Sequence, residues 1–275
     1  MAGIKSILLH VDATPSSIAR LAITRQLAVR LEARITALFA ATADAERMSF
    51  AYSASALMAH ESAAGDPAHE LAKGRLQRSV ASDGPPVAWC EVGADSIAHG
   101  FVEEAAYADL LVVGQQADVP EQGGAPDGFV DAMILDSGRP TLVIPRVLGT
   151  GSVGRRVLVA WDGSAPAARA LTGSLPFLER ADQVHVVSWS SHPRAAPFSR
   201  LDVTGYLREH DVAAASHLRH ATSHVAAELA ALAASLQADL VVMGCYGHSR
   251  RSERIFGGVS RAALAGAAVA LLMAH

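Results

Sequence analysis

The sequence predicts an α/β fold built from two tandem doubly wound domains, each containing a mainly parallel five-stranded sheet. The length of 275 residues suits two domains of ordinary size. A pair of sequence motifs also occurs twice in the same order. Between these motifs, short apolar runs alternate with longer stretches rich in alanine and leucine, which is typical of alternating strands and helices.

The repeat defines the domain organisation. Its first motif is an apolar run that ends in aspartate, ILLHVD at 7–12 and VLVAWD at 157–162. Its second motif is ADLLVVG at 108–114 and ADLVVMG at 238–244. A glycine-rich stretch near 146–154 has the composition of a linker. We therefore predict one domain at 1–147 and a second at 154–275.

The two domains differ in length. Asp12 and Asp109 are separated by 97 residues, whereas Asp162 and Asp239 are separated by 77. The first domain therefore carries about 20 extra residues, which we assign to the Ala/Ser-rich segment 40–65 as a loop with a helical turn.

The elements of the second domain follow from its hydrophobic pattern. Uninterrupted apolar strands such as 240–243 are typical of a parallel sheet that is covered on both faces. Thr222 or Ser223 is expected to begin the third helix, with Glu228 following. We expect strands near 155–161, 183–189, 212–217, 239–243 and 268–273, and helices near 165–178, 199–209, 222–237 and 258–266.

Composition excludes several classes of protein. The net charge is −4 and no long basic run occurs, so nucleic acid is not an expected partner. Cys90 and Cys245 lie far apart without metal-binding spacing and are expected to be reduced thiols. No uninterrupted apolar window is long enough to cross a membrane and no leader pattern is present, so we expect a cytoplasmic protein without a membrane partner.

A glycine-rich loop is the main candidate for ligand binding. In a doubly wound sheet the ligand lies beyond the carboxyl ends of the strands, which here means the loops after Asp162 and Gly244. Glycines let the backbone approach a phosphate, and a helix N-terminus favours an anion. On spacing alone, a purely structural role for these glycines stays open. The loop supplies four glycines, a hydroxyl and three basic side chains: Gly244, Gly247, Gly257, Gly258, Ser260, His248, Arg250 and Arg251.

The pattern GxxG, nine residues, then G, placed after DLVVMG, resembles the ATP-binding motif of the universal stress protein family. The openings VAWDGS and LLHVDATP also resemble that family, so the resemblance covers nearly the whole chain as a tandem repeat of UspA-like domains. It implies a Rossmann-like, adenine nucleotide alpha hydrolase-like fold and a stress-response or regulatory protein that binds ATP with Mg²⁺ in its second domain. The implied nucleotide-binding residues are Ala160, Trp161, Asp162, Gly163, Met243, Gly244, Gly247, His248, Arg250, Gly257, Gly258, Val259 and Ser260.

Two features of the second domain depart from this pattern. Gly258 stands where ATP-binding relatives commonly have Ser or Thr, which removes a hydrogen bond worth about 1 kcal/mol. The indole of Trp161 either stacks on an adenine or fills the space of the base, and Trp189 poses the same question. An alternative function therefore stays open, a structural or protein-interaction module of the same fold that binds no nucleotide.

The first domain departs further. Gln115, Gln116 and Ala117 replace the start of the glycine loop, and Asp131 takes a position that should offer a hydroxyl. Acidic side chains disfavour a phosphate at this place, and only one glycine is retained; the residues are Asp118, Glu121, Asp127 and Gly128. We predict that this domain has lost the phosphate loop and keeps Asp12 as a residue of the fold. A different, non-phosphate ligand near 41–65 is the alternative.

No residue set predicts catalysis or a metal site. Four histidines, His210, His217, His220 and His224, are expected on a solvated face, with His217 in a strand or loop and His224 in a helix. Ser164 lacks a nucleophile elbow and no Walker motif occurs, so at most weak ATP hydrolysis is expected. The family resemblance implies that 141–145 and 269–273 pair as the last strands of an intramolecular pseudo-dimer. A homodimer and unidentified protein partners stay open.

Overall fold

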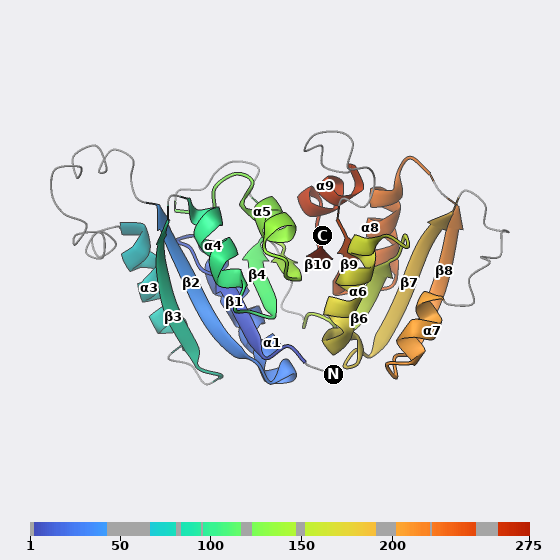
Figure 1. Ribbon diagram of the computed structural model, residues 1–275, viewed down its shortest axis with the longest axis horizontal. Coiled ribbons are helices and arrows are strands. Elements are labelled where there is room, and N and C mark those ends of the chain that lie inside the picture. The colour runs from blue at the N-terminus through green and yellow to red at the C-terminus, as the bar shows by residue number, and fades with distance from the viewer. Residues whose placement is uncertain are drawn as a thin grey trace. The chain divides into compact units, whose positions relative to one another are not determined.

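The structure is a computed structural model that describes residues 3–42, 67–80, 84–94, 96–116, 123–146, 152–190, 202–220, 222–245 and 258–275. It divides into two compact units, Met1–Arg139 and Pro140–His275. Both units alternate strands with helices (Figure 1). None of the described helices is long and apolar enough to cross a membrane.

The first unit is a parallel sheet with helices on both faces. Its strands lie in the order β3-β2-β1-β4. Helix α1 packs against α3, and α4 packs against α5 on the opposite face (Figure 1). The elements are β1 (Ser6–His10), α1 (Ser16–Leu31), β2 (Arg34–Thr42), α3 (Pro67–Val80), β3 (Val87–Ala94), α4 (Ile97–Ala105), β4 (Leu110–Gly114) and α5 (Phe129–Asp136).

The second unit repeats this arrangement and adds two strands, β10 parallel to β9 and β5 antiparallel to β10. Its strands lie in the order β5-β10-β9-β6-β7-β8, so β8-β7-β6-β9 corresponds to β3-β2-β1-β4. The elements are β5 (Thr141–Ile144), β6 (Arg156–Ala160), α6 (Ala165–Leu178), β7 (Gln183–Ser190), α7 (Val203–Arg208), β8 (Ala214–His220), α8 (Val225–Ser235), β9 (Leu240–Gly244), α9 (Gly258–Ala265) and β10 (Ala270–Ala274).

Strand β5 belongs to the second unit because it pairs antiparallel with β10, with Val143 opposite Leu271. These strands are the two segments whose pairing the family resemblance implies. The domain boundary at 147–154 remains a sequence prediction, and residues 147–151 of it lie outside the described ranges.

The predicted fold class is confirmed, and each strand and helix predicted for the second domain has a counterpart in the structure. The bounds differ at β8, which spans 214–220 rather than 212–217, and at α7, which spans 203–208 within the predicted 199–209. Helix α6 has the predicted bounds, and its start follows from a local capping signal in the sequence. The hydroxyl of Ser164 accepts a hydrogen bond from the backbone nitrogen of Ala167 at 3.2 Å, and Pro166 lies in the first turn. Strands β6, β9 and β10 are almost entirely buried, which explains their uninterrupted apolar sequences.

The predicted start of the third helix is wrong. Helix α8 begins at Val225 after His224, not at Thr222 or Ser223. The Thr222 hydroxyl instead accepts a hydrogen bond from the backbone nitrogen of His224 at 3.2 Å. Thr222 therefore organises the turn before the helix, a role that Ser and Thr side chains also favour.

Candidate functional site

The carboxyl ends of β6 and β9 define the candidate site. These strands are parallel neighbours, and Ala160 is in register with Met243. The residues that follow, Trp161 to Gly163 after β6 and Gly244 at the end of β9, therefore lie at the same edge of the sheet. The strand pairing thus brings together the residues after β6 and the end of β9, which are described parts of the two loops predicted to bind a ligand.

Asp162 presents its carboxylate at this edge. The side chain is exposed, and its Oδ1 accepts a hydrogen bond from the backbone nitrogen of Ser164 at 2.9 Å. Gly163 has a φ of +76°, a left-handed conformation that favours glycine. The turn that holds Asp162 therefore leads directly into the N-terminus of α6.

Trp161 continues the sheet for one residue beyond β6. Its backbone nitrogen donates a hydrogen bond to the carbonyl oxygen of Val187 at 2.8 Å, and its side chain is half-buried. The backbone of this residue is therefore fixed by the neighbouring strand β7.

Gly244 is required by packing. A Cβ at this residue would lie 2.6 Å from the carbonyl carbon of Pro166 and would overlap the backbone nitrogen of Ala167. The glycine thus allows the first turn of α6 to approach β9 at backbone distance. The sequence pattern assigns this glycine to the ligand-binding loop. The contact with α6 depends on the three-dimensional arrangement and is not apparent from the sequence.

The N-terminus of α9 supplies the described part of the predicted phosphate loop. Gly258, Val259 and Ser260 are its first three residues. Among the described residues, no heavy atom lies within 4 Å of a Cβ built on Gly258, whereas Ser260 is 5% exposed and packs inward. The remaining predicted loop residues lie outside the described ranges: Gly247, His248, Arg250, Arg251 and Gly257.

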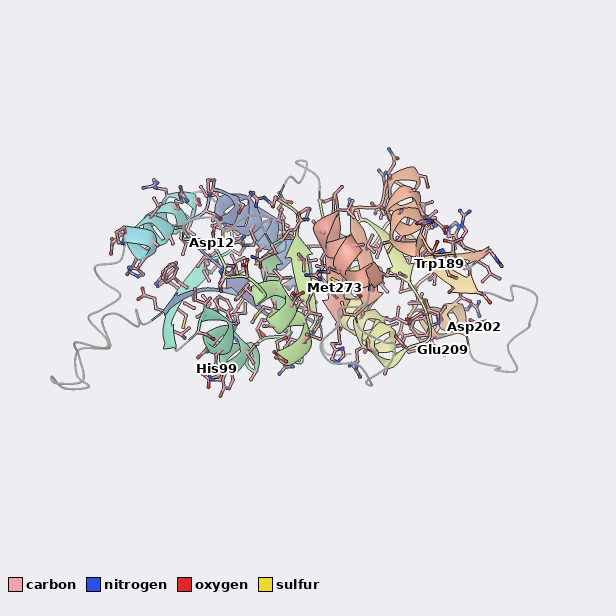
Figure 2. All side chains as sticks on the ribbon, turned by 90° about the horizontal axis from the view of Figure 1, so that it is seen from above. Asp12, His99, Trp189, Asp202, Glu209 and Met273 are labelled. Carbon is pink, nitrogen blue, oxygen red and sulfur yellow. The ribbon has the colours of Figure 1, made fainter. Side chains whose placement is uncertain are left out.

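Trp189 is held by α8. The residue lies near the end of β7 (Figure 2). Its indole nitrogen donates a hydrogen bond to Glu228 Oε2 at 2.8 Å, and the hydroxyl of Thr222 donates to Glu228 Oε1 at 2.5 Å. The hydrogen bonds from Thr222 and Trp189 lower the pKa of Glu228. The indole is therefore already engaged with protein, which favours a packing role for Trp189. Sequence reasoning missed this contact because Glu228 was assigned only to the start of a helix.

The four histidines of the predicted cluster do not lie on one element: His217 is in a strand as expected, whereas the prediction that His224 lies in a helix is wrong. His217 and His220 lie on β8, His224 precedes α8 and His210 follows α7. His217 instead contacts His185 on β7, with Nε2 and Nδ1 3.0 Å apart. Burial and the neighbouring His217 lower the pKa of His185. Among the described residues, no group of three or more His, Cys, Asp or Glu side chains could hold a metal ion.

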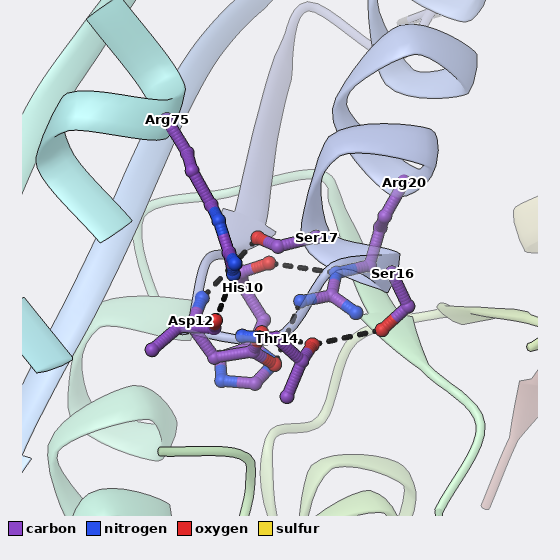
Figure 3. Close-up of polar contacts among 8 residues, drawn as sticks. His10, Asp12, Thr14, Ser16, Ser17, Arg20 and Arg75 are labelled. Atoms are coloured by element: carbon purple, nitrogen blue, oxygen red, sulfur yellow. Dashed lines mark hydrogen bonds and ion pairs between the residues drawn. The ribbon is translucent and has the colours of Figure 1, made fainter. Parts of the chain in front are cut away.

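The corresponding place in the first domain is occupied by an ion pair. Asp12 is 7% exposed, and its Oδ2 accepts a hydrogen bond from Arg20 Nη2 at 2.9 Å (Figure 3). Its Oδ1 accepts hydrogen bonds from the backbone nitrogen and hydroxyl of Thr14, at 3.0 and 2.5 Å. Burial opposes ionisation, but Arg20 and these hydrogen bonds bring the pKa of Asp12 below its usual value.

His10 completes this buried cluster. It packs between Phe101 and Phe129, with ring centroids 5.1 and 4.6 Å away. Burial and the nearby Arg20 lower the pKa of His10 to about 3, although Asp12 acts in the opposite direction. The histidine is therefore neutral at pH 7, and the net charge of the Asp12–Arg20 pair is zero. Sequence reasoning singled out neither His10 nor Arg20.

Gly123, which precedes α5, contacts the loop that carries Asp12. The backbone nitrogen of Ala13 donates to the carbonyl oxygen of Gly123 at 2.9 Å, and a Cβ on Gly123 would lie 2.7 Å from the Ala13 Cβ. Gly128 immediately precedes α5, and Asp131 lies in its first turn. Gln115, Gln116 and Asp127 are described, whereas Ala117, Asp118 and Glu121 and most of segment 41–65 are not.

Comparison with known proteins assigns the second domain. Residues 154–275 match the model of the Universal stress protein family. No curated protein matches the chain.

Solved structures with 15–16% sequence identity share the fold over 98% of this chain. A universal stress protein from Archaeoglobus fulgidus has a TM-score of 0.69 at 15% identity, with 97% of its own chain covered. A functionally unknown protein from Pseudomonas aeruginosa PAO1 has a TM-score of 0.63 at 16% identity, with 92% of its chain covered. A putative universal stress protein from P. aeruginosa UCBPP-PA14 has a TM-score of 0.61 at 15% identity, with 93% of its chain covered. Residues 154–275 are therefore a domain of the universal stress protein family.

Proposed function

We propose that the chain is a tandem universal stress protein whose second domain binds ATP, with Mg²⁺, as part of a stress-response or regulatory role. One observation carries the proposal. Within the segment that matches the family, Asp162 and Gly244 meet at the carboxyl edge of adjacent strands, and the loop after Gly244 leads to the N-terminus of α9. This is the edge at which doubly wound sheets bind ligands.

The chemistry at this edge suits the two ends of a nucleotide. The exposed Asp162 carboxylate can accept hydrogen bonds from ribose hydroxyls. The first turn of α9 offers backbone N–H groups without intrahelical partners, which favour a phosphate. The sequence adds His248, Arg250 and Arg251 in the intervening loop, where they would balance the phosphate charge.

We propose that the first domain has the same ancestry but binds no nucleotide. Its strand order matches that of the second domain, which supports duplication. Asp12, however, is buried and already bonded to Arg20 and Thr14. A carboxylate with these partners has little capacity left to accept a ribose hydroxyl.

Calorimetric titration of magnesium ATP into the full-length protein tests the proposal. We expect heat of binding and a rise in Tm at millimolar ATP. Asp162→Ala should weaken binding, whereas Asp182→Ala, a change at another exposed acid of the second domain, should not. Absence of both heat and thermal shift would favour the alternative function, a module that interacts with proteins without nucleotide.

A further inference from the structure

We propose that Arg20 is a built-in ligand of the first domain: its guanidinium occupies the space between Asp12 and Gly114, at the carboxyl ends of β1 and β4. We call this space the first ligand position. Without the arginine side chain it would be a binding site for an alkylguanidinium cation. The inference goes beyond the proposed function and does not depend on ATP binding in the second domain.

The guanidinium makes contacts on three sides. Its Nε donates to the carbonyl oxygen of His10 at 2.8 Å, and its Nη2 donates to Asp12 Oδ2 at 2.9 Å (Figure 3). Its Nη1 lies where a Cβ of residue 114 would be, and its Cζ lies 3.4 Å from that point. Arg20 therefore joins the end of β1 to the end of β4, two strands that are parallel neighbours.

The site matches a cation rather than a nucleotide. Arg20 is 2% exposed, so the guanidinium has left water and depends on the protein for its hydrogen bonds. Asp12 supplies the negative charge and the His10 carbonyl supplies a neutral acceptor. The planar guanidinium presents donors in fixed directions, which these two acceptors use.

The second domain has an alanine where the first domain has this arginine. Asp12 and Asp162 occupy corresponding places, and the residue eight positions later is Arg20 in the first domain but Ala170 in the second. Ala170 is fully buried. Gly244 corresponds to Gly114, but its missing Cβ makes room for the backbone of α6 rather than for a side chain. Both domains therefore have a glycine at the end of this strand, but it makes room for the Arg20 guanidinium in the first domain and for helix backbone in the second.

Chemical rescue tests whether the first ligand position is a guanidinium site. Arg20→Ala removes the atoms that N-ethylguanidine restores, and leaves Asp12 buried without its counter-ion. We expect the Tm of the full chain to fall by roughly 10 °C or more. N-ethylguanidine at low millimolar concentration should then raise it by roughly 5 °C, through binding to the vacated space.

Leu27→Ala is the matched control, because Leu27 lies on the same helix and is equally buried. It should also lower the Tm, but N-ethylguanidine should not restore it, and ethylammonium at the same concentration should rescue neither variant. Loss of stability in R20A with N-ethylguanidine rescue supports the proposal. An R20A variant as stable as the wild type, or equal rescue of L27A, would overturn it.

Gly114→Ala provides a second test if R20A does not fold. The added methyl should displace the guanidinium and lower the Tm, whereas Gly93→Ala, where no atom of the described residues lies within 4 Å, should not lower it comparably. Where R20A folds, Gly114→Ala should cost little in that background, since the clashing group is gone. A G114A variant as stable as the wild type would contradict the proposed position of the guanidinium.

Discussion

The carboxylate of Asp239 accepts a hydrogen bond from the backbone nitrogen of Gly154 at 2.7 Å, across 85 residues of sequence. It also accepts from the backbone nitrogens of Arg155 and Arg156, at 2.9 and 3.2 Å. Asp109 binds the backbone nitrogens of Lys5 and Ser6 in the same way, at 2.8 and 2.9 Å. The aspartate of the second repeated motif thus fixes the start of the first strand in each domain.

Removal of this acceptor should destabilise the second domain. In Asp239→Ala the backbone nitrogens near the start of β6 lose a charged partner, and we expect the free energy of unfolding to fall by about 1–3 kcal/mol. Urea unfolding of the full chain measures the loss. Asp182→Ala is the control, because its ion pair with Arg155 is half exposed or more on both sides and should contribute at most about 1 kcal/mol. Equal losses in the two variants would refute this role.

The buried His10 should make the first domain less stable in mild acid. Its pKa is about 3 in the folded state and near 6.5 when unfolded, so between these values the unfolded chain binds the extra proton. Stability is therefore lost as the pH falls from 6.5 towards 3, by up to about 1.4 kcal/mol per pH unit. His10→Leu, which cannot titrate, should lose less stability than the wild type between pH 6 and 4.

Urea unfolding at several pH values checks this slope. His185, whose pKa is also lowered, acts in the same direction but is present in both proteins and cancels in the comparison. His99→Gln is the control, because His99 is 64% exposed and should leave the slope unchanged. A wild-type slope equal to that of His10→Leu would show that His10 is not the buried neutral group described.

Gly244 and Gly258 should respond differently to an added methyl group. Gly244→Ala places a Cβ against the backbone of Pro166 and Ala167, which cannot move without separating α6 from β9. We expect a loss of about 1–3 kcal/mol or more in urea unfolding. Gly258→Ala meets no atom of the described residues within 4 Å and should change stability by less than about 1 kcal/mol. A larger loss at Gly258 than at Gly244 would contradict the packing described.

Gly258→Ser should strengthen ATP binding. Within the part of the chain that the structure describes, the built Cβ has no neighbour within 4 Å, and a serine would add the hydroxyl that the family resemblance implies at this position. One added hydrogen bond of about 1 kcal/mol corresponds to roughly a fivefold gain in affinity. Calorimetry compares the variant with Gly93→Ser, which also has open space and lies in the first domain. Unchanged or weaker binding in Gly258→Ser would argue against phosphate contact at this residue.

Much of the fold could be predicted from the sequence because its signals are local. Ser164 and Pro166 encode the start of α6, and uninterrupted apolar runs encode the buried strands. The repeated aspartates align the two domains by sequence alone. The start of α8 was missed because Thr222 bonds to the turn and to Glu228 rather than to the first helical turn, and both uses suit the same residue type.

The first ligand position could not be predicted, because its partners are distant in sequence. Arg20 lies in an alanine- and leucine-rich helix where an arginine is usually solvated, and Gly114 lies 94 residues later. Only the parallel pairing of β1 with β4 brings them together. The same holds for His185 and His217, whose contact depends on the register of β7 with β8.

Titration of magnesium ATP into Gly247→Glu and Ala117→Glu most directly tests the claim that one domain alone binds nucleotide. These positions correspond in the two domains, and each change adds one carboxylate to the loop after the fourth strand. We predict that Gly247→Glu abolishes the heat of binding, whereas Ala117→Glu leaves affinity and a stoichiometry of about one intact. Equal loss in both variants, or binding that survives Gly247→Glu, would contradict the account.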